Sequence, residues 1–279
     1  MINMNQPKLY SQSNTTQLTD NTDMLNNHLK MIEWHKEENI LEIGVGDGRC
    51  TTELLIPSFP KDFHSYVGTD ISESMVEFAK ENYKLPRVKF MKLDIQSPEI
   101  PATLHEKFHH IFSMLCLHWV RNNRQASVNM FNLLRPGGEI LCSLVEQNSI
   151  DDAFFNLSKN PKWAPYGHEK YLTRYFFCDD VAKEWEKHLI DAGFVDVKVI
   201  KEEKSYVYDS EENYKNFYLA CNPIVKQIPC ESTSEYLNDF FEECKRGPMT
   251  EITYSDEKKQ PVYKLNYVRL VLYARKPSE

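Results

Sequence analysis

Short apolar runs alternate with amphipathic segments through the first half of the chain. The runs at 39–46, 65–70, 87–95, 109–119 and 139–146 have the length of buried strands. Between them, apolar residues recur every three to four positions, as expected for helices with one buried face. Regular alternation of strands and helices is typical of a parallel sheet covered on both faces. The predicted helices cover residues 17–31, 47–59, 72–83 and 122–135.

The pattern changes after the fifth predicted strand. Residues 150–178 are rich in aromatic side chains without a strand pattern, and residues 210–245 are helical in pattern. Residues 179–194 predict a further amphipathic helix. Two late strands, 194–208 and 265–276, leave no room for an ordinary crossover helix beside the sheet. We therefore expect them to extend one edge of the sheet, with the last strand antiparallel.

Composition narrows the class of protein. The 279 residues are sufficient for one large domain, and the net charge of −8 comes without any cluster of Lys or Arg. This charge argues against nucleic acid or an anionic membrane as a partner. The 7 cysteines are scattered without a C-x-x-C pair, which predicts free thiols and neither a metal site nor a disulfide framework. With no signal-peptide pattern and no long apolar run, we expect a cytoplasmic protein.

A glycine-rich loop, LEIGVGDGRC at 41–50, directly follows the first predicted strand. A phosphate-binding P-loop requires a Lys after its last glycine, whereas RCTT follows Gly48 here. A dinucleotide-binding loop requires G-x-G-x-x-G, and the spacing G-V-G-D-G does not match it. A tight turn without any ligand is a further interpretation of the glycines.

Acidic residues accompany this loop at the carboxyl ends of the strands. Glu42 precedes the first glycine by two positions, Asp70 ends the second strand, and Asp94 ends the third, followed by Ile95. Open α/β sheets bind ligands at this edge. A carboxylate there can accept hydrogen bonds from both hydroxyls of a ribose or from an adenine amino group. Three acids suit a cationic nucleoside better than a pyrophosphate, so Glu42 is a predicted contact of such a ligand, together with Asp70 and Asp94.

These motifs together resemble the class I S-adenosylmethionine-dependent methyltransferases. The resemblance rests on E-x-G-x-G-x-G, D-I-S-x-x-M, L-D-I and LLRPGGEI. It implies a Rossmann-like, seven-stranded α/β sheet with an antiparallel last strand and a helical cap, and S-adenosylmethionine as cofactor. The implied cofactor contacts are Gly44, Gly46, Asp70, Ile71, Asp94 and Ile95. The single domain 1–279 would comprise an N-terminal helical segment (1–34), a cofactor-binding core (35–146), a cap (147–179 and 209–262) and the remaining sheet strands (180–208 and 263–279).

A second resemblance is narrower and runs over almost the whole chain. The stretches KLYSQSNTTQ, DISESMVEFAKENY, CLHWVRNNRQA, NPKW and LYARK are similar to the insect juvenile hormone acid O-methyltransferases. This resemblance implies that Gln17, His118 and Trp119 hold the carboxylate of a small apolar acid such as juvenile hormone acid or farnesoic acid. We expect the aromatic residues of the cap to line the acceptor pocket. These are Phe154, Phe155, Trp163, Tyr166, Tyr171, Phe176 and Phe177.

Two alternatives stay open. The acceptor could be another carboxylic acid, an amine or a phenol; for an amine or phenol, His118 would serve as the base. The chain could also be a cofactor-binding pseudoenzyme. A homodimer is one of the assemblies that the pattern leaves open.

Overall fold

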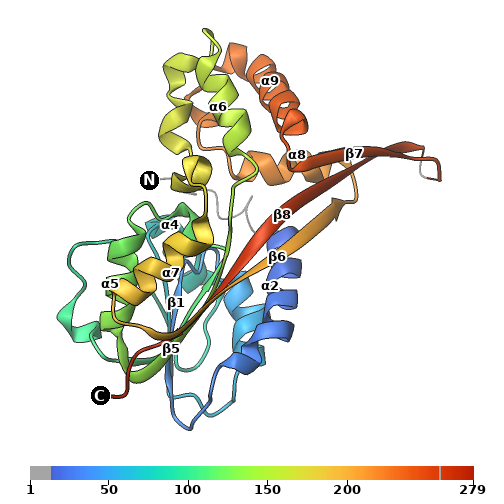
Figure 1. The fold of residues 1–279 in the computed structure, drawn as a ribbon. Helices are drawn as coiled ribbons and strands as arrows, with labels where there is room; N and C mark the ends of the chain where they lie inside the picture. The colour runs from blue at the N-terminus through green and yellow to red at the C-terminus, as the bar shows by residue number, and fades with distance from the viewer. Residues whose placement is uncertain (1–13, 258) are drawn as a thin grey trace.

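The structure is a computed structural model that describes residues 14–257 and 259–279 (Figure 1). The first part of the predicted N-terminal segment therefore lies outside the described residues. The strands are β1 (Asn39–Ile43), β2 (Ser65–Asp70), β3 (Val88–Lys92), β4 (Phe108–Met114), β5 (Leu134–Val145), β6 (Val195–Tyr208), β7 (Thr250–Ser255) and β8 (Gln260–Arg275). The main helices are α2 (Thr15–His28), α3 (Ile56–Ser58), α4 (Glu73–Asn82), α5 (Asn123–Leu133), α6 (Asp151–Lys159), α7 (Val181–Asp191), α8 (Glu211–Ala220) and α9 (Thr233–Arg246).

One sheet has the strand order β3-β2-β1-β4-β5-β8-β6. Strands β1 to β5 pair in parallel, and β8 is antiparallel to both of its neighbours, β5 and β6. This order confirms the predicted methyltransferase sheet with its antiparallel last strand. The seven strands of this order are those of the predicted sheet, and β7 pairs with β8 off this path as an eighth strand, inside the segment assigned to the helical cap.

Helices cover both faces of the sheet, which explains why its central strands carry buried apolar side chains on both faces. On one face, α5 and α7 contribute Met130 and Trp185 to a core built on the sheet. On the other face, α2 contributes Met24, which packs with Phe59 and Phe112. Side-chain caps start several of the helices; Ser72, for example, accepts the backbone N–H of Met75, and Asp180 accepts that of Lys183.

Strand β4 ends earlier than the apolar run predicts. The strand stops at Met114, Leu115 adopts a positive φ of 49°, and a short 3-10 helix, η4 (Leu117–Trp119), follows. The prediction of a strand through residue 119 was therefore wrong. This turn brings His118 and Trp119 out of the sheet plane, above the carboxyl ends of the parallel strands.

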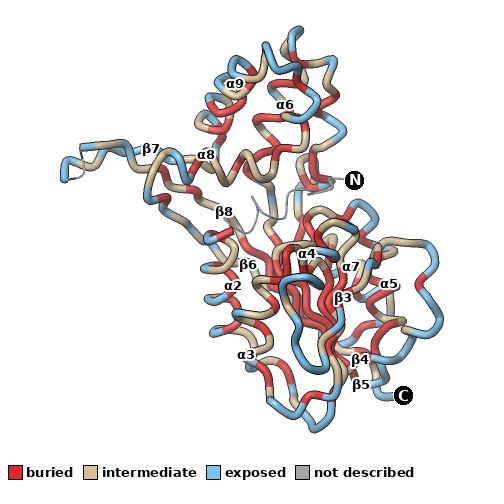
Figure 2. The backbone as a smooth tube through the Cα atoms, turned by 180° about the vertical axis from the view of Figure 1, so that it is seen from behind, coloured by how far each residue is buried: buried red, intermediate tan, exposed pale blue. Residues whose placement is uncertain are grey.

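The cap has its own aromatic core of buried side chains from α6, α8 and α9. Strands β6 and β8 continue from the sheet into this core, where Tyr208, Tyr263 and Leu265 are buried (Figures 1 and 2). The two regions thus share continuous strands. Among the described helices, none combines the length and apolar character that a membrane crossing requires.

Candidate active site

The glycine loop starts where β1 ends and is shaped by close backbone contact. Gly44 has a φ of +80°, and a Cβ added there would lie 2.1 Å from the Sγ of Cys116. Only glycine fits such a position without strain. The next glycine, Gly46, has a φ of +57°, and its N–H donates to Oδ2 of Asp70 at 2.9 Å. The loop is therefore tied to the end of β2.

Asp70 is the acidic group at the centre of this arrangement. Its Oδ1 accepts the N–H of Ser72 at 2.8 Å, while Oδ2 accepts the N–H of Gly46. Burial raises the pKa of Asp70, and hydrogen bonds from the backbone N–H groups of Ser72, Gly46 and Ile71 oppose that shift. Each carboxylate oxygen has about two acceptor positions, so both oxygens can accept a further hydroxyl donor.

A pocket beside the loop, which we call the cofactor pocket, brings most of the predicted cofactor residues together. Asp94 orders its own turn, since its Oδ1 accepts the N–H of Gln96 at 3.1 Å. Gln96 in turn accepts the N–H groups of Arg121 and Asn122, both at 3.0 Å. This connects the end of β3 to the chain after η4. The pocket is lined by Ile43, Gly44, Asp70, Ile71, Leu93, Asp94, Ile95, Gln96, Cys116, Trp119 and Val120.

Two predicted cofactor residues, Glu42 and Gly46, are not among the lining residues of this pocket. Glu42 is buried, and its Oε2 accepts the hydroxyls of Thr51 at 2.5 Å and Tyr66 at 2.6 Å. Burial raises the pKa of Glu42 to about 7. Glu42 thus ties the segment after the loop to β2. Contact of Glu42 or Gly46 with the cofactor stays a prediction.

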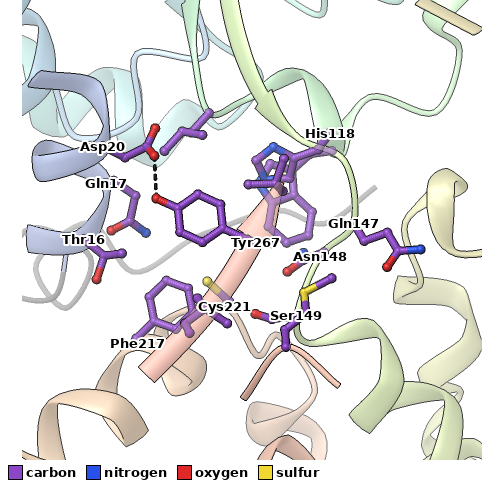
Figure 3. Close-up of a pocket in the computed structure, with 15 residues that line it drawn as sticks. Thr16, Gln17, Asp20, His118, Gln147, Asn148, Ser149, Phe217, Cys221 and Tyr267 are labelled. Atoms are coloured by element: carbon purple, nitrogen blue, oxygen red, sulfur yellow. Dashed lines mark hydrogen bonds between the residues drawn. The ribbon is translucent and has the colours of Figure 1, made fainter. Parts of the chain in front are cut away.

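A second pocket lies between α2, the sheet and the cap (Figure 3). It encloses about 650 Å³ of empty space, including its open mouth. Its apolar lining comes from Leu115, Trp119, Val145, Phe217, Cys221, Met249 and Leu265, and its polar lining from Thr16, Gln17, Asp20, His118, Gln147, Asn148, Ser149 and Tyr267.

The second pocket is lined by all three predicted acceptor residues, Gln17, His118 and Trp119, and we call it the acceptor pocket. The Oε1 atom of Gln17 and the Nδ1 atom of His118 are buried, and neither has a hydrogen-bond partner among the described residues. Buried polar atoms without partners are rare, and at a pocket wall they indicate a missing polar ligand. Burial lowers the pKa of His118 to about 3, so the imidazole is neutral.

Trp119 connects the two pockets because it lines both of them. Its ring also packs against His118, with the ring centroids 4.8 Å apart. The residues on either side of Trp119 each line one pocket: His118 lines the second pocket, and Val120 lines the first. Two ligands, one in each pocket, would therefore both contact Trp119. A group-transfer reaction requires its two reactants to lie close together in this way.

Helix α2, which carries Gln17, is attached to the sheet by a buried arginine. Arg269 of β8 is fully buried and donates to Asp20 at 3.1 Å and to Glu202 at 2.8 Å. Asp20 also accepts the hydroxyl of Tyr267 at 2.5 Å (Figure 3). Asp20 and Gln17 lie one helical turn apart and face the same pocket, so this network positions Gln17 as well.

The expectation that the cap aromatics line the acceptor pocket was wrong. None of the seven predicted residues is among its lining residues. Phe154 and Trp163 are instead buried in the cap core, and Phe177 is 73% exposed. The apolar lining comes partly from Phe217 and Met249, which sequence reasoning missed because apolar residues in a core and in a pocket have the same pattern.

Replacing Gly44 by alanine is a direct test of the loop. We expect a loss of about 2 kcal/mol in the free energy of unfolding and at least tenfold weaker cofactor binding, because the new Cβ overlaps Cys116 and the φ is positive. Gly137→Ala is the matched control, since Gly137 also has a φ of +80° but its added Cβ would meet only Ser278, at 3.5 Å. Denaturant unfolding and calorimetric titration measure both effects. Equal behaviour of the two variants would contradict the crowding at Cys116.

Comparison with known proteins finds similar methyltransferases. A family model described as a methyltransferase domain matches residues 40–138. A juvenile hormone acid O-methyltransferase of Bombyx mori is 31% identical over 276 residues, which cover 98% of this chain and 98% of that protein. One from Drosophila melanogaster is 30% identical over 287 residues, covering 99% of this chain and 94% of that protein.

Solved structures share the fold. The YcgJ protein from Bacillus subtilis has a TM-score of 0.60 at 15% identity, covering 92% of this chain and 99% of that one. Phosphoethanolamine N-methyltransferase 2 of Haemonchus contortus in complex with S-adenosyl-L-methionine has a TM-score of 0.50 at 15% identity, covering 99% and 60%. Because the similarity to the Bombyx mori enzyme extends over almost the whole chain, the protein belongs to the juvenile hormone acid O-methyltransferase family of methyltransferases, with S-adenosylmethionine as cofactor.

Proposed function

We propose that the protein transfers the methyl group of S-adenosylmethionine to the carboxylate of a small apolar acid, with sesquiterpenoid acids such as juvenile hormone acid or farnesoic acid as first candidates. The observation that carries the proposal is the pair of unpartnered buried atoms, Oε1 of Gln17 and Nδ1 of His118, in one pocket. His118 packs against Trp119, which also lines the cofactor pocket, and Gln17 lines the same acceptor pocket from α2. The names of the relatives support the same acceptor.

The residues of the cofactor pocket fit this cofactor. Asp70 faces the pocket with both carboxylate oxygens able to accept ribose hydroxyls, and Asp94 with Ile95 offers an acceptor and an apolar surface for the adenine. Gly44 leaves room for the side chain of Cys116, which lines the same pocket. When bound, S-adenosylmethionine supplies an electrophilic methyl group on a positively charged sulfur.

The second pocket meets the needs of a carboxylate acceptor. A carboxylate is ionised at neutral pH and already nucleophilic, so it needs to be held rather than deprotonated. Neutral His118 can donate one N–H, and the Gln17 amide can turn its NH2 group to the same ligand, because the two ends of an amide are assigned only by their partners. Trp119 excludes water between the pockets, which strengthens these hydrogen bonds.

The low pKa of His118 also bears on the alternative in which it acts as a base. An imidazole whose pKa is lowered to about 3 is uncharged above about pH 4, and it is a weak base far below the optimum for proton abstraction near neutral pH. The pocket therefore suits a carboxylate acceptor better than an amine or phenol acceptor, which needs such a base. The same shift removes His118 as a source of pH dependence in the rate between about pH 5 and pH 8.

Replacing His118 tests its role as a donor. His118→Ala is expected to lower turnover at least tenfold, about 1.4 kcal/mol, with unchanged affinity for S-adenosylmethionine. His118→Gln keeps a donor but provides no base, so under our proposal it retains more activity than the alanine variant. Steady-state rates and calorimetric titration check both variants. Wild-type turnover in His118→Ala would refute the assignment, and equal loss in both variants would favour the base.

A further inference from the structure

Asn148 occupies the segment between β5 and α6 and lines the acceptor pocket. Its Nδ2 atom is buried and has no hydrogen-bond partner among the described residues. Figure 3 shows it in the same pocket as Gln17 and His118, which come from α2 and η4. Three separate elements thus each present one unpartnered polar atom to one space.

The orientation of the Asn148 amide is determined by its other end. Its Oδ1 accepts the backbone N–H of Ile150 at 3.4 Å, in a turn that leads into α6. A backbone N–H can only donate, so this end must be the carbonyl oxygen. The other end, whose nitrogen is buried without a partner in a residue that lines the pocket, is therefore the NH2 group, which can only donate. The unpartnered atoms of Gln17 and His118 have no such constraint, because an amide can flip and an imidazole can change tautomer.

A fixed donor selects the chemical class of the ligand that it meets. A hydrogen-bond acceptor such as a carboxylate oxygen satisfies the NH2 group, whereas a protonated amine would place donor against donor. A carboxylate has about four acceptor positions, of which the attacking oxygen must keep one lone pair for the methyl carbon. Three donors therefore match the three remaining positions.

We propose that Asn148 is a third acceptor-binding residue, which donates to the carboxylate of the methyl acceptor and thereby favours an anionic acceptor over a cationic one. This inference rests on the proposed function and specifies how that site recognises charge. It also explains how an anion is held although the Asp20 carboxylate lines the same pocket. Asp20 is paired with Arg269 and accepts the hydroxyl of Tyr267, and the three donors face the substrate.

Asn148→Asp is the decisive variant because it separates the donor from the turn. An aspartate retains the oxygen that accepts the N–H of Ile150 but replaces the NH2 group by a second, negatively charged oxygen. We expect the affinity for the acid substrate to fall at least tenfold more than the affinity for its uncharged methyl ester. Affinity for S-adenosylmethionine is expected to remain unchanged. Asn148→Ala, which adds no charge, should raise KM for the acid by about threefold to tenfold.

Asn160→Asp is the matched control, since Oδ1 of Asn160 also accepts an N–H two residues on, from Lys162 at 2.9 Å, and Asn160 does not line the acceptor pocket. It should bind acid and ester as the wild type does. Competition titrations with the acid and with its methyl ester give the two affinities for each variant. Equal losses of acid and ester affinity in Asn148→Asp, or no loss of either, would overturn the role of Asn148. If the wild type methylates no acid at all, the proposed function itself fails, which is a distinct result.

Discussion

Asp70→Ala is expected to weaken S-adenosylmethionine binding by about 100-fold. The substitution removes a carboxylate that can accept both ribose hydroxyls, and two such charge-assisted hydrogen bonds together contribute about 3 kcal/mol. It also removes the acceptor for the N–H groups of Gly46 and Ser72, so the glycine loop loses its attachment to β2. Both effects act in the same direction on the cofactor. Calorimetric titration of the variant with S-adenosylmethionine gives the change directly.

Asp94→Asn is the comparison for this experiment. Asp94 lines the same pocket, and an asparagine keeps the oxygen that accepts the N–H of Gln96. We expect a smaller loss of cofactor affinity, about tenfold or less, because the amide can still accept one hydrogen bond. An Asp70→Ala variant that binds the cofactor as tightly as the wild type does would eliminate the ribose assignment.

Arg269→Met is expected to cause the largest loss of folding stability, about 3–5 kcal/mol. The guanidinium is fully buried, and the side chain of Asp20 is only 2% exposed. Its five N–H groups are all used, by Asp20, Asp23 and Glu202. Methionine fills the space but leaves the Asp20 carboxylate buried without its cation. The melting temperature should fall by about 10 °C or more.

Two further variants show whether this loss comes from the unpaired charge. The double variant Arg269→Met, Asp20→Asn should recover much of the stability, because no buried carboxylate remains unpaired. Arg275→Met lies on the same strand, where Arg275 forms a partly exposed ion pair with Asp196, and should change the melting temperature little. Scanning calorimetry and denaturant unfolding compare the three. Equal melting temperatures of Arg269→Met and the wild type would contradict the importance of this network.

The parallel part of the fold could be predicted from the sequence because its signals are local. Apolar runs and amphipathic segments determine the strands and helices, and the glycines at 44 and 46 indicate the sharp turn after β1. The end of β4 could not be predicted in this way. The apolar run continues to residue 119, but the chain turns at Leu115, and Cys116 packs where Gly44 has no side chain. That contact joins residues 72 positions apart.

The residues of the acceptor pocket were even harder to predict from local sequence patterns. Gln17, His118 and Trp119 were placed in it by family resemblance, and the structure brings them together. Asn148 carries no motif, and its importance comes from an unpartnered atom that only three-dimensional structure can show. The aromatic residues of the cap were wrongly assigned because burial in a protein core and contact with an apolar ligand favour the same side chains.

Methyl transfer to a panel of matched acceptors shows whether the protein methylates a carboxylate. The protein is incubated with methyl-labelled S-adenosylmethionine and a panel of matched C15 acceptors that differ only in their terminal group, namely sesquiterpenoid acid, alcohol and amine, and the products are identified by mass. We expect label in the methyl ester of the acid and none in the other two products. Label in the amine or the alcohol without label in the acid would refute the proposed function.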